Sequence, residues 1–249
     1  MAITEVFPNP TVKQVIFQIK FPSLFYLESK MGDLQLKLMK EFPESALLYR
    51  RRLVLADLGP GAKLEDINSD QDSNLTKIWQ FKSMNGCILN VMDDSLDISS
   101  EYHKTYSQPG EPRFRDVIEL VVGSFLELTN LPIIQRVGLR YIDECPIFVK
   151  DNESFLAWYN STFPLQRFPI SLADEMSFRA VVQRGDFRLC YMETLQLNDG
   201  KQNLLLDFDG FTGHTPADAY LDVADKLHEM IGSEYENSIR QPLIDHMRK

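Results

Sequence analysis

Two aspartates late in the chain are the residues of this sequence best placed to do chemistry as a pair. Asp207 and Asp209, in the segment DFDG, are two residues apart, so on a β-strand both side chains project from the same face. Paired carboxylates can hold a magnesium ion when further ligands and usually a phosphate substrate are present. The pair therefore allows a metal site, although neighbouring arginines offer these carboxylates a simpler ionic partner.

Arginines on the polar sides of predicted strands are the second set of candidates. In the segment RVGLRYID, if Val137, Leu139 and Tyr141 point into the core, strand alternation places Arg136 and Arg140 on the opposite face. Guanidinium groups gathered on one face suit phosphate or carboxylate groups, so this face could bind an anionic ligand. Alternatively, the arginines are solvated or paired with acidic residues of neighbouring strands. The same alternation gives the full ligand-binding set, with Lys82 beside it: Arg50, Arg52, Arg136, Arg140, Arg179 and Arg188.

The other residue types that could do catalysis lack a diagnostic spacing. The four histidines form no H-x-x-x-H or H-E-x-x-H motif, no serine lies in a G-x-S-x-G elbow, and there is no glycine-rich phosphate loop. Cys87, Cys145 and Cys190 are an odd number without a C-x-x-C spacing, which indicates neither a disulfide framework nor a zinc site and fits a reducing cytoplasm. We therefore expect no cofactor, and a binding role is favoured over an enzyme.

Composition narrows the choice of partners. The 36 acidic and 26 basic residues give a formal net charge of -10, which disfavours a protein whose whole surface coats nucleic acid or anionic lipid. The most apolar predicted helix, near Val117 to Leu128, is interrupted by Glu119 and Glu127 and is too short to cross a bilayer. The first residues have Glu5 and two prolines where a signal peptide needs a basic start and an unbroken apolar run. We expect no association with membranes.

A repeated pattern predicts the fold. Three short strands followed by one long amphipathic helix occur at about residues 77–129 and again at 176–239. The pattern predicts an α+β fold, an antiparallel twisted sheet with helices on one face, which could consist of two pseudo-repeated halves. The expected helices are at about 23–42, 112–129 and 215–239. Residues 1–249 are expected to form a single unit; a half-domain boundary near 146–170, and hence a continuous or a split sheet, stay open.

Local signals predict where these elements begin and turn. Ser23 is expected to cap the first helix, and Thr215 to cap the last one with Pro216 as its first residue. A strand is expected at 46–56, and the polar segment from Asp57 to Asn74 is expected to be a mobile loop. Asn-Gly and Asp-Gly sequences predict hairpin turns at Asn85-Gly86 and Asp199-Gly200.

Several segments resemble a known family. VGLRYID and LLLDFDGF, together with NPTVKQVIFQIKF, FKSMNGCILNV and LHEMIGSEYENSI, resemble an uncharacterised, sporadically distributed bacterial protein family of similar length. The resemblance spans nearly the whole chain, and its motifs are strand and helix patterns. It implies a single unit of bacterial origin and no established activity, cofactor or catalytic residue.

Three functions follow from these observations. The first is a non-catalytic binding or accessory module that acts with a protein partner in a multi-component bacterial system. The second is recognition of an anionic ligand, a nucleotide or a nucleic-acid segment, on the arginine-bearing sheet face. The third and weakest is a metal-dependent phosphoesterase built on Asp207 and Asp209. The sequence leaves open the identity of the partner or ligand and the oligomeric state.

Overall fold

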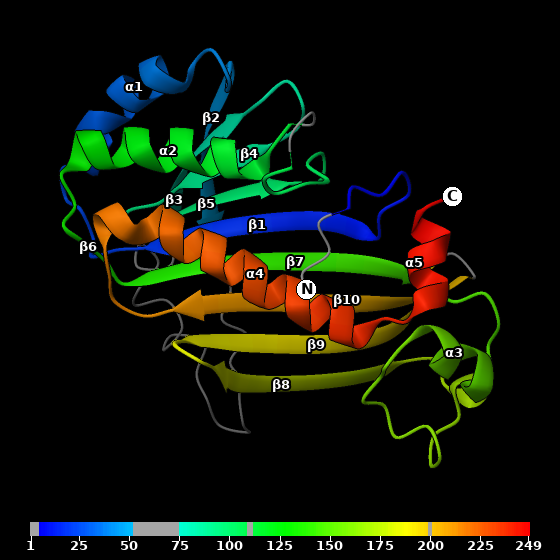
Figure 1. Ribbon diagram of the computed structural model, residues 1–249. Coiled ribbons are helices and arrows are strands. Elements are labelled where there is room, and N and C mark those ends of the chain that lie inside the picture. Colours follow the sequence, from blue (N-terminus) through cyan, green and yellow to red (C-terminus); the bar gives the residue numbers. More distant parts are fainter. Residues whose placement is uncertain (1–4, 52–74, 109–111, 199–200) are drawn as a thin grey trace, which may run out of the picture.

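The computed structural model describes residues 5–51, 75–108, 112–198 and 201–249 (Figure 1). The strands are β1 (Val12–Lys20), β2 (Glu44–Arg51), β3 (Leu75–Lys82), β4 (Ile88–Val91), β5 (Ser95–Ser100), β6 (Ile133–Ile134), β7 (Arg136–Pro146), β8 (Met176–Arg184), β9 (Phe187–Asn198), β10 (Lys201–Thr212) and β11 (Thr215–Pro216). The helices are α1 (Leu27–Leu38), α2 (Phe114–Thr129), α3 (Asn152–Trp158), α4 (Tyr220–Ser238) and α5 (Gln241–Met247).

Nine of the strands form one antiparallel sheet, which confirms the predicted fold class. Their order is β2-β3-β4-β5-β1-β7-β10-β9-β8, while β6 and β11 make a separate two-stranded ribbon. Outward from the central pair β1 and β7, the sheet continues through β5, β4 and β3 on one side and through β10, β9 and β8 on the other. Each of these three-strand meanders is followed in the chain by a long helix, α2 or α4. The sheet is therefore continuous, and both copies of the repeated pattern contribute to it.

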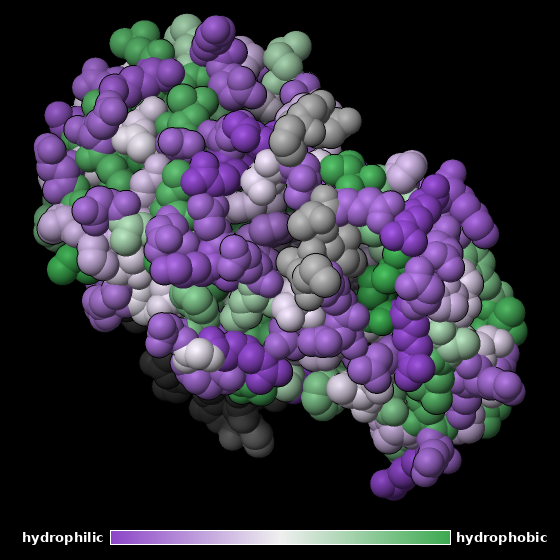
Figure 2. Space-filling view, viewed as in Figure 1, coloured by the Kyte–Doolittle hydropathy of each residue, from purple (hydrophilic) through white to green (hydrophobic). Residues whose placement is uncertain are grey.

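The core lies between one face of the sheet and the helices α1, α2 and α4, which cover that face (Figure 1). Alternate residues of the central strands, among them Phe17 of β1, Leu139 of β7 and Phe208 of β10, are fully buried there. They pack with the apolar stripes of α2 and α4, which include Phe125 and Leu227. Each such side chain contributes about 1.5–3 kcal/mol of hydrophobic free energy. The outer surface of α2 and α4 is mainly hydrophilic (Figure 2), as expected for amphipathic helices.

Both predicted helix caps are wrong, because tertiary pairing overrides the local signal. Thr215 does not cap a helix and Pro216 is not a helical residue: they form β11, which pairs with Ile133 and Ile134. A short 3₁₀ helix, Ala217–Ala219, follows, and α4 starts at Tyr220. In the same way, α1 starts at Leu27 with Tyr26 in the N-cap position. Ser23 lies outside that helix because the chain first turns against the β4–β5 hairpin, where the Leu24 N–H donates to the Asp93 carbonyl at 3.0 Å.

The hairpin prediction at Asn85-Gly86 is confirmed. Gly86 has a φ of +77° and joins β3 to β4, a conformation that glycine adopts without steric cost. The expected loop at 57–74, the end of the strand expected at 46–56, and the Asp199-Gly200 turn lie outside the described residues. Within the part of the chain that the structure describes, no helix combines the length and apolar character needed to cross a membrane.

Candidate functional site

The strand register places five of the six candidate arginines on the sheet face opposite α1, α2 and α4. Arg140 lies directly opposite Ile16 of β1 and Asp209 of β10, and paired residues point to the same side of a sheet. We call this side the arginine face. Its arginines are Arg50 on β2, Arg136 and Arg140 on β7, Arg179 on β8 and Arg188 on β9. Arg52 lies outside the described residues.

The five arginines do not form one cluster. Arg50 is on β2, at one edge of the sheet, and Arg179 is on β8, at the other edge. Arg50 instead interacts with Asp97. Burial raises the pKa of the Asp97 carboxyl, and the charge of Arg50 partly opposes this shift. The structure brings Arg136 and Arg140 of β7 together with the aspartates of β10, and Arg188 lies on β9, the next strand.

Arg136 is held by three partners. Its Nη2 donates to both carboxylate oxygens of Asp209, at 2.9 and 3.0 Å, and its Nη1 donates to Gln18 Oε1 at 3.0 Å. The guanidinium also lies 4.7 Å from the centre of the Phe211 ring. Gly138 provides the space, since a Cβ at that position would lie only 2.3 Å from Arg136 Nη1. A larger residue at Gly138 would displace this guanidinium.

Arg140 forms the second ion pair of the arginine face. Its Nε donates to Asp207 Oδ1 at 2.8 Å, and its Nη2 donates to Oδ2 of the same carboxylate. Asp207 is 6% exposed, and this hydrogen bond raises the pKa of Arg140. Burial raises the pKa of Asp209, although the charges of Arg136 and Arg140 oppose the shift.

Both aspartates considered as magnesium ligands thus bind a guanidinium. The described residues contain no group of three or more histidine, cysteine, aspartate or glutamate side chains placed to hold a metal ion. The two carboxylates neutralise Arg136 and Arg140 and hold them in fixed positions, with Arg136 beside the Phe211 ring.

Two other arginines keep their charge available. Arg179 and Arg188 are exposed, and neither has a hydrogen bond or ion pair with a described residue. Arg188 lies 5.7 Å from the Phe211 ring, on the strand adjacent to the two aspartates. Four half-exposed apolar side chains of the central and neighbouring strands share this face: Ile16, Ile142, Met192 and Leu205. The face therefore combines unpaired guanidinium groups with accessible apolar surface.

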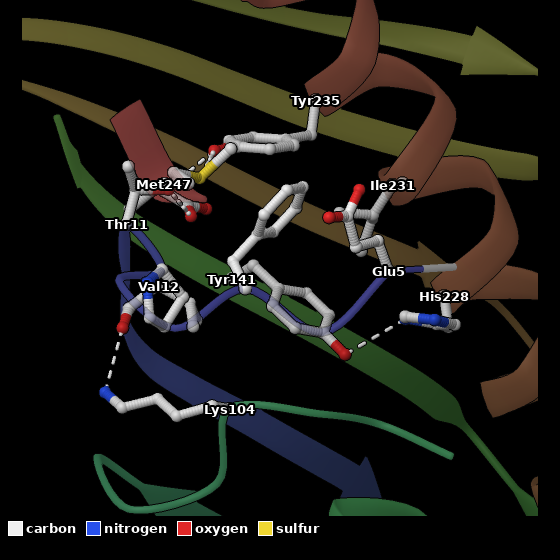
Figure 3. Close-up of a pocket in the computed structure, with 13 residues that line it drawn as sticks. Glu5, Thr11, Val12, Lys104, Tyr141, His228, Ile231, Tyr235 and Met247 are labelled. Carbon is white, nitrogen blue, oxygen red and sulfur yellow. Dashed lines mark hydrogen bonds between the residues drawn. The ribbon is translucent and has the colours of Figure 1, made fainter. Parts of the chain in front are cut away.

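A cavity of about 140 Å³ lies on the other side of β7 (Figure 3). The residues around it come from the N-terminal segment, β7, α4 and α5, with Lys104 from the loop after β5. Thr11 and Met247 lie at one end of the view and His228 at the other, with Tyr141 between them.

Asp143 is the buried charge of this cavity. It is 6% exposed, and burial raises the pKa of its carboxyl to about 7. The Thr11 hydroxyl donates to Oδ1 at 2.8 Å, and the same hydroxyl lies 2.6 Å from the Tyr235 hydroxyl. Among the described residues, Oδ2 of Asp143 has no hydrogen-bond partner.

His228 is held as a neutral ring. Burial lowers its pKa to about 4, the ring stacks on Tyr106 with 4.3 Å between centroids, and Nδ1 lies 3.1 Å from the Tyr141 hydroxyl. No hydrogen bond joins His228 to Asp143 within the described chain, and neither serine nor cysteine lines the cavity. His228 therefore has no described serine or cysteine beside it in this cavity, and the hydroxyl that donates to Asp143 is that of Thr11.

This cavity was not predicted from the sequence. One signal was available: Asp143 continues the buried alternation of Val137, Leu139 and Tyr141, so a charged residue occupies a position where an apolar one is expected. His228 carried no such signal, because its contact with Tyr141 joins residues 87 positions apart.

A scan against protein-family models and searches of curated proteins and of solved structures find no match to this chain. The function is therefore inferred from the arginine face and the cavity themselves.

The Arg140–Asp207 pair yields a stability prediction. We expect Asp207→Ala to lower the free energy of unfolding by about 1–3 kcal/mol, because it removes both hydrogen bonds of the Arg140 guanidinium to this carboxylate and leaves its charge without a partner. Glu144→Ala, which removes the more exposed Lys13–Glu144 pair, should cost under about 1 kcal/mol. Urea denaturation of both variants tests this, and equal losses would contradict the assignment.

Asp143 yields a prediction about pH. Because its pKa is higher in the folded protein than in the unfolded chain, folding binds an extra proton, and stability falls as the pH rises from about 4 to about 7. The lowered pKa of His228 has the opposite effect on stability, which rises with pH. This contribution is the same in the wild type and in a variant of Asp143, so it cancels when the two are compared.

Asp143→Asn removes the cost of burying the charge and keeps an acceptor for Thr11. Relative to the wild type, the variant should gain about 1–3 kcal/mol of unfolding free energy between pH 5 and pH 8. Urea denaturation of both proteins at pH 5 and pH 8 measures this gain in unfolding free energy. If the stability of the variant and of the wild type changed in parallel with pH, Asp143 would not be buried as a charge.

Proposed function

We propose that this chain is a non-catalytic binding module that docks a protein partner on the arginine face. The observation that carries the proposal is the presence of Arg179 and Arg188, exposed and without an ionic partner among the described residues, beside the half-exposed Met192 and Leu205. Arginine, methionine and aromatic residues are enriched at protein interfaces, where apolar contacts supply affinity and charges supply orientation. The complementary partner surface carries carboxylates next to apolar side chains.

Three facts favour a protein over a nucleic acid as the partner. The net charge of -10 opposes the approach of a polyphosphate. Arg136 and Arg140 are neutralised by Asp209 and Asp207, which leaves few charges for a phosphate backbone. Apolar side chains on the same face would gain nothing from phosphates.

Recognition of an anionic ligand such as a nucleotide is the second candidate, because a free phosphate group could bind Arg179 and Arg188 without any apolar contact. A metal-dependent phosphoesterase is disfavoured, because Asp207 and Asp209, the two carboxylates that it needs, both bind arginine. An accessory role in a multi-component bacterial system extends the first proposal and rests on the sequence resemblance. The three cysteines are unpaired, so the search for the partner belongs in a reducing compartment such as the cytoplasm.

Site-specific photo-cross-linking in the native cell tests the proposal. A photoreactive residue at Met192 or at Thr194, both on the arginine face, should give a cross-link to the same protein. Leu36, which is 70% exposed on α1, is the matched position on the helix side and should not give this product. The charge reversal Arg179→Glu with Arg188→Glu should abolish the cross-link, since it opposes carboxylates with carboxylates.

The control reversal is Lys37→Glu with Lys226→Glu, at exposed lysines of α1 and α4, and it should leave the product unchanged. Loss of the product in both double variants would attribute the effect to net charge and contradict docking at the arginine face. Binding of a nucleotide by the purified protein that weakens steeply with salt, without any protein cross-link, would favour the second candidate.

A further inference from the structure

The cavity beside β7 has the composition of a site for a positively charged group. Asp143 lines it with a carboxylate that is 6% exposed, and Oδ2 of this carboxylate has no hydrogen-bond partner among the described residues. The side chains of Phe7, Tyr141 and Tyr235 contribute aromatic surface to the walls. We propose that this cavity binds a small organic cation, a primary or methylated ammonium group, between the Asp143 carboxylate and these aromatic rings.

The charges that face the cavity support a cationic occupant. Within the described chain Asp143 has no ion pair, and burying an unpaired carboxylate is costly unless an opposite charge approaches it. Glu5, from the N-terminal segment, also lines the cavity, but its carboxylate is bonded to Arg248 at 2.7 Å. His228 remains uncharged at neutral pH and so does not repel a cation.

Lys104 is the one competing cation among the described lining residues. Its ammonium donates to the Val12 carbonyl at 3.1 Å, and its side chain is exposed at the edge of the cavity. Its charge lowers the pKa of Asp143 less than burial raises it. Lys104 therefore does not neutralise the carboxylate.

The aromatic walls and the size define the class of ligand. Quaternary and methylated ammonium groups bind to aromatic faces through cation–π attraction, which strengthens when water is excluded. The tyrosine hydroxyls are already engaged, that of Tyr235 with Thr11 and that of Tyr141 with His228, so the rings offer mainly their apolar surface. A volume of about 140 Å³ suits a cation of a few carbon atoms and is too small for a nucleotide.

The test uses the full chain, with methylammonium and tetramethylammonium chloride as probes. Sodium chloride at equal concentration controls for ionic strength, and tert-butanol is the uncharged analogue of similar shape. Calorimetry should detect binding of at least one ammonium probe and no binding of tert-butanol. Asp143→Asn should weaken that binding by about tenfold or more, whereas Glu144→Gln, the adjacent residue on the opposite face, should leave it unchanged.

Binding by the unaltered protein provides an independent measure if Asp143→Asn does not fold. The affinity for the ammonium probe should rise between pH 6 and pH 8, as Asp143 ionises. Equal binding of the ammonium probes and tert-butanol, equal affinity in both variants, a flat pH profile, or no binding of either ammonium probe would overturn the proposal.

Discussion

The register of β7 against β1 and β10 is the constraint on which the rest of the structure depends. Leu139 lies opposite Phe17 of β1, and both are buried under the helices. Because side chains alternate along a strand, this pairing sends Arg136 and Arg140 to the other face. A slip of one residue would turn both arginines into the core, where an uncompensated charge costs several kcal/mol. The hydrophobic core and the position of the arginines are therefore set by the same pairing.

One strand supplies both candidate sites because its two faces have different surroundings. On the arginine face, β7 and β10 are joined by diagonal ion pairs: Arg140 lies directly opposite Asp209, yet it bonds to Asp207. These pairs hold two guanidinium groups in place. Arg179 and Arg188, on the outer strands, have no ionic partner in the part of the chain that the structure describes. On the helix face, the same strand carries Asp143 into a cavity beside α4, where burial dominates its electrostatics.

Strand alternation was predictable from the sequence because it depends on neighbours in the chain. The placement of Arg136 and Arg140 opposite Leu139 needed only a period of two, and the repeated meander followed by a helix needed only turn residues and an apolar stripe. The failed predictions depend on distant partners. Thr215 has a good capping side chain, but its pairing with Ile134 in β6 decides its conformation.

The same distinction applies to the sites. The sequence allowed the arginines of β7 to pair with acidic residues of neighbouring strands. Which residue pairs with which, Asp207 with Arg140, follows from a register that joins residues 67 positions apart. His228 contacts Tyr141 only because α4 packs on β7, which no local pattern encodes. Asp143 differs from these residues, because an acidic residue at a buried position of a strand can be recognised from the strand alternation alone.

Modification of Cys190 tests most directly whether the arginine face is an occupied docking surface. Cys190 lies on that face, opposite Asp209 and Val181, whereas Cys87 and Cys145 are buried and serve as internal controls. A thiol reagent should label Cys190 in the purified protein, fail to label it in native cells, and label it again in cells when Arg179 and Arg188 are replaced by glutamate. Equal labelling of Cys190 in all three cases would contradict the account.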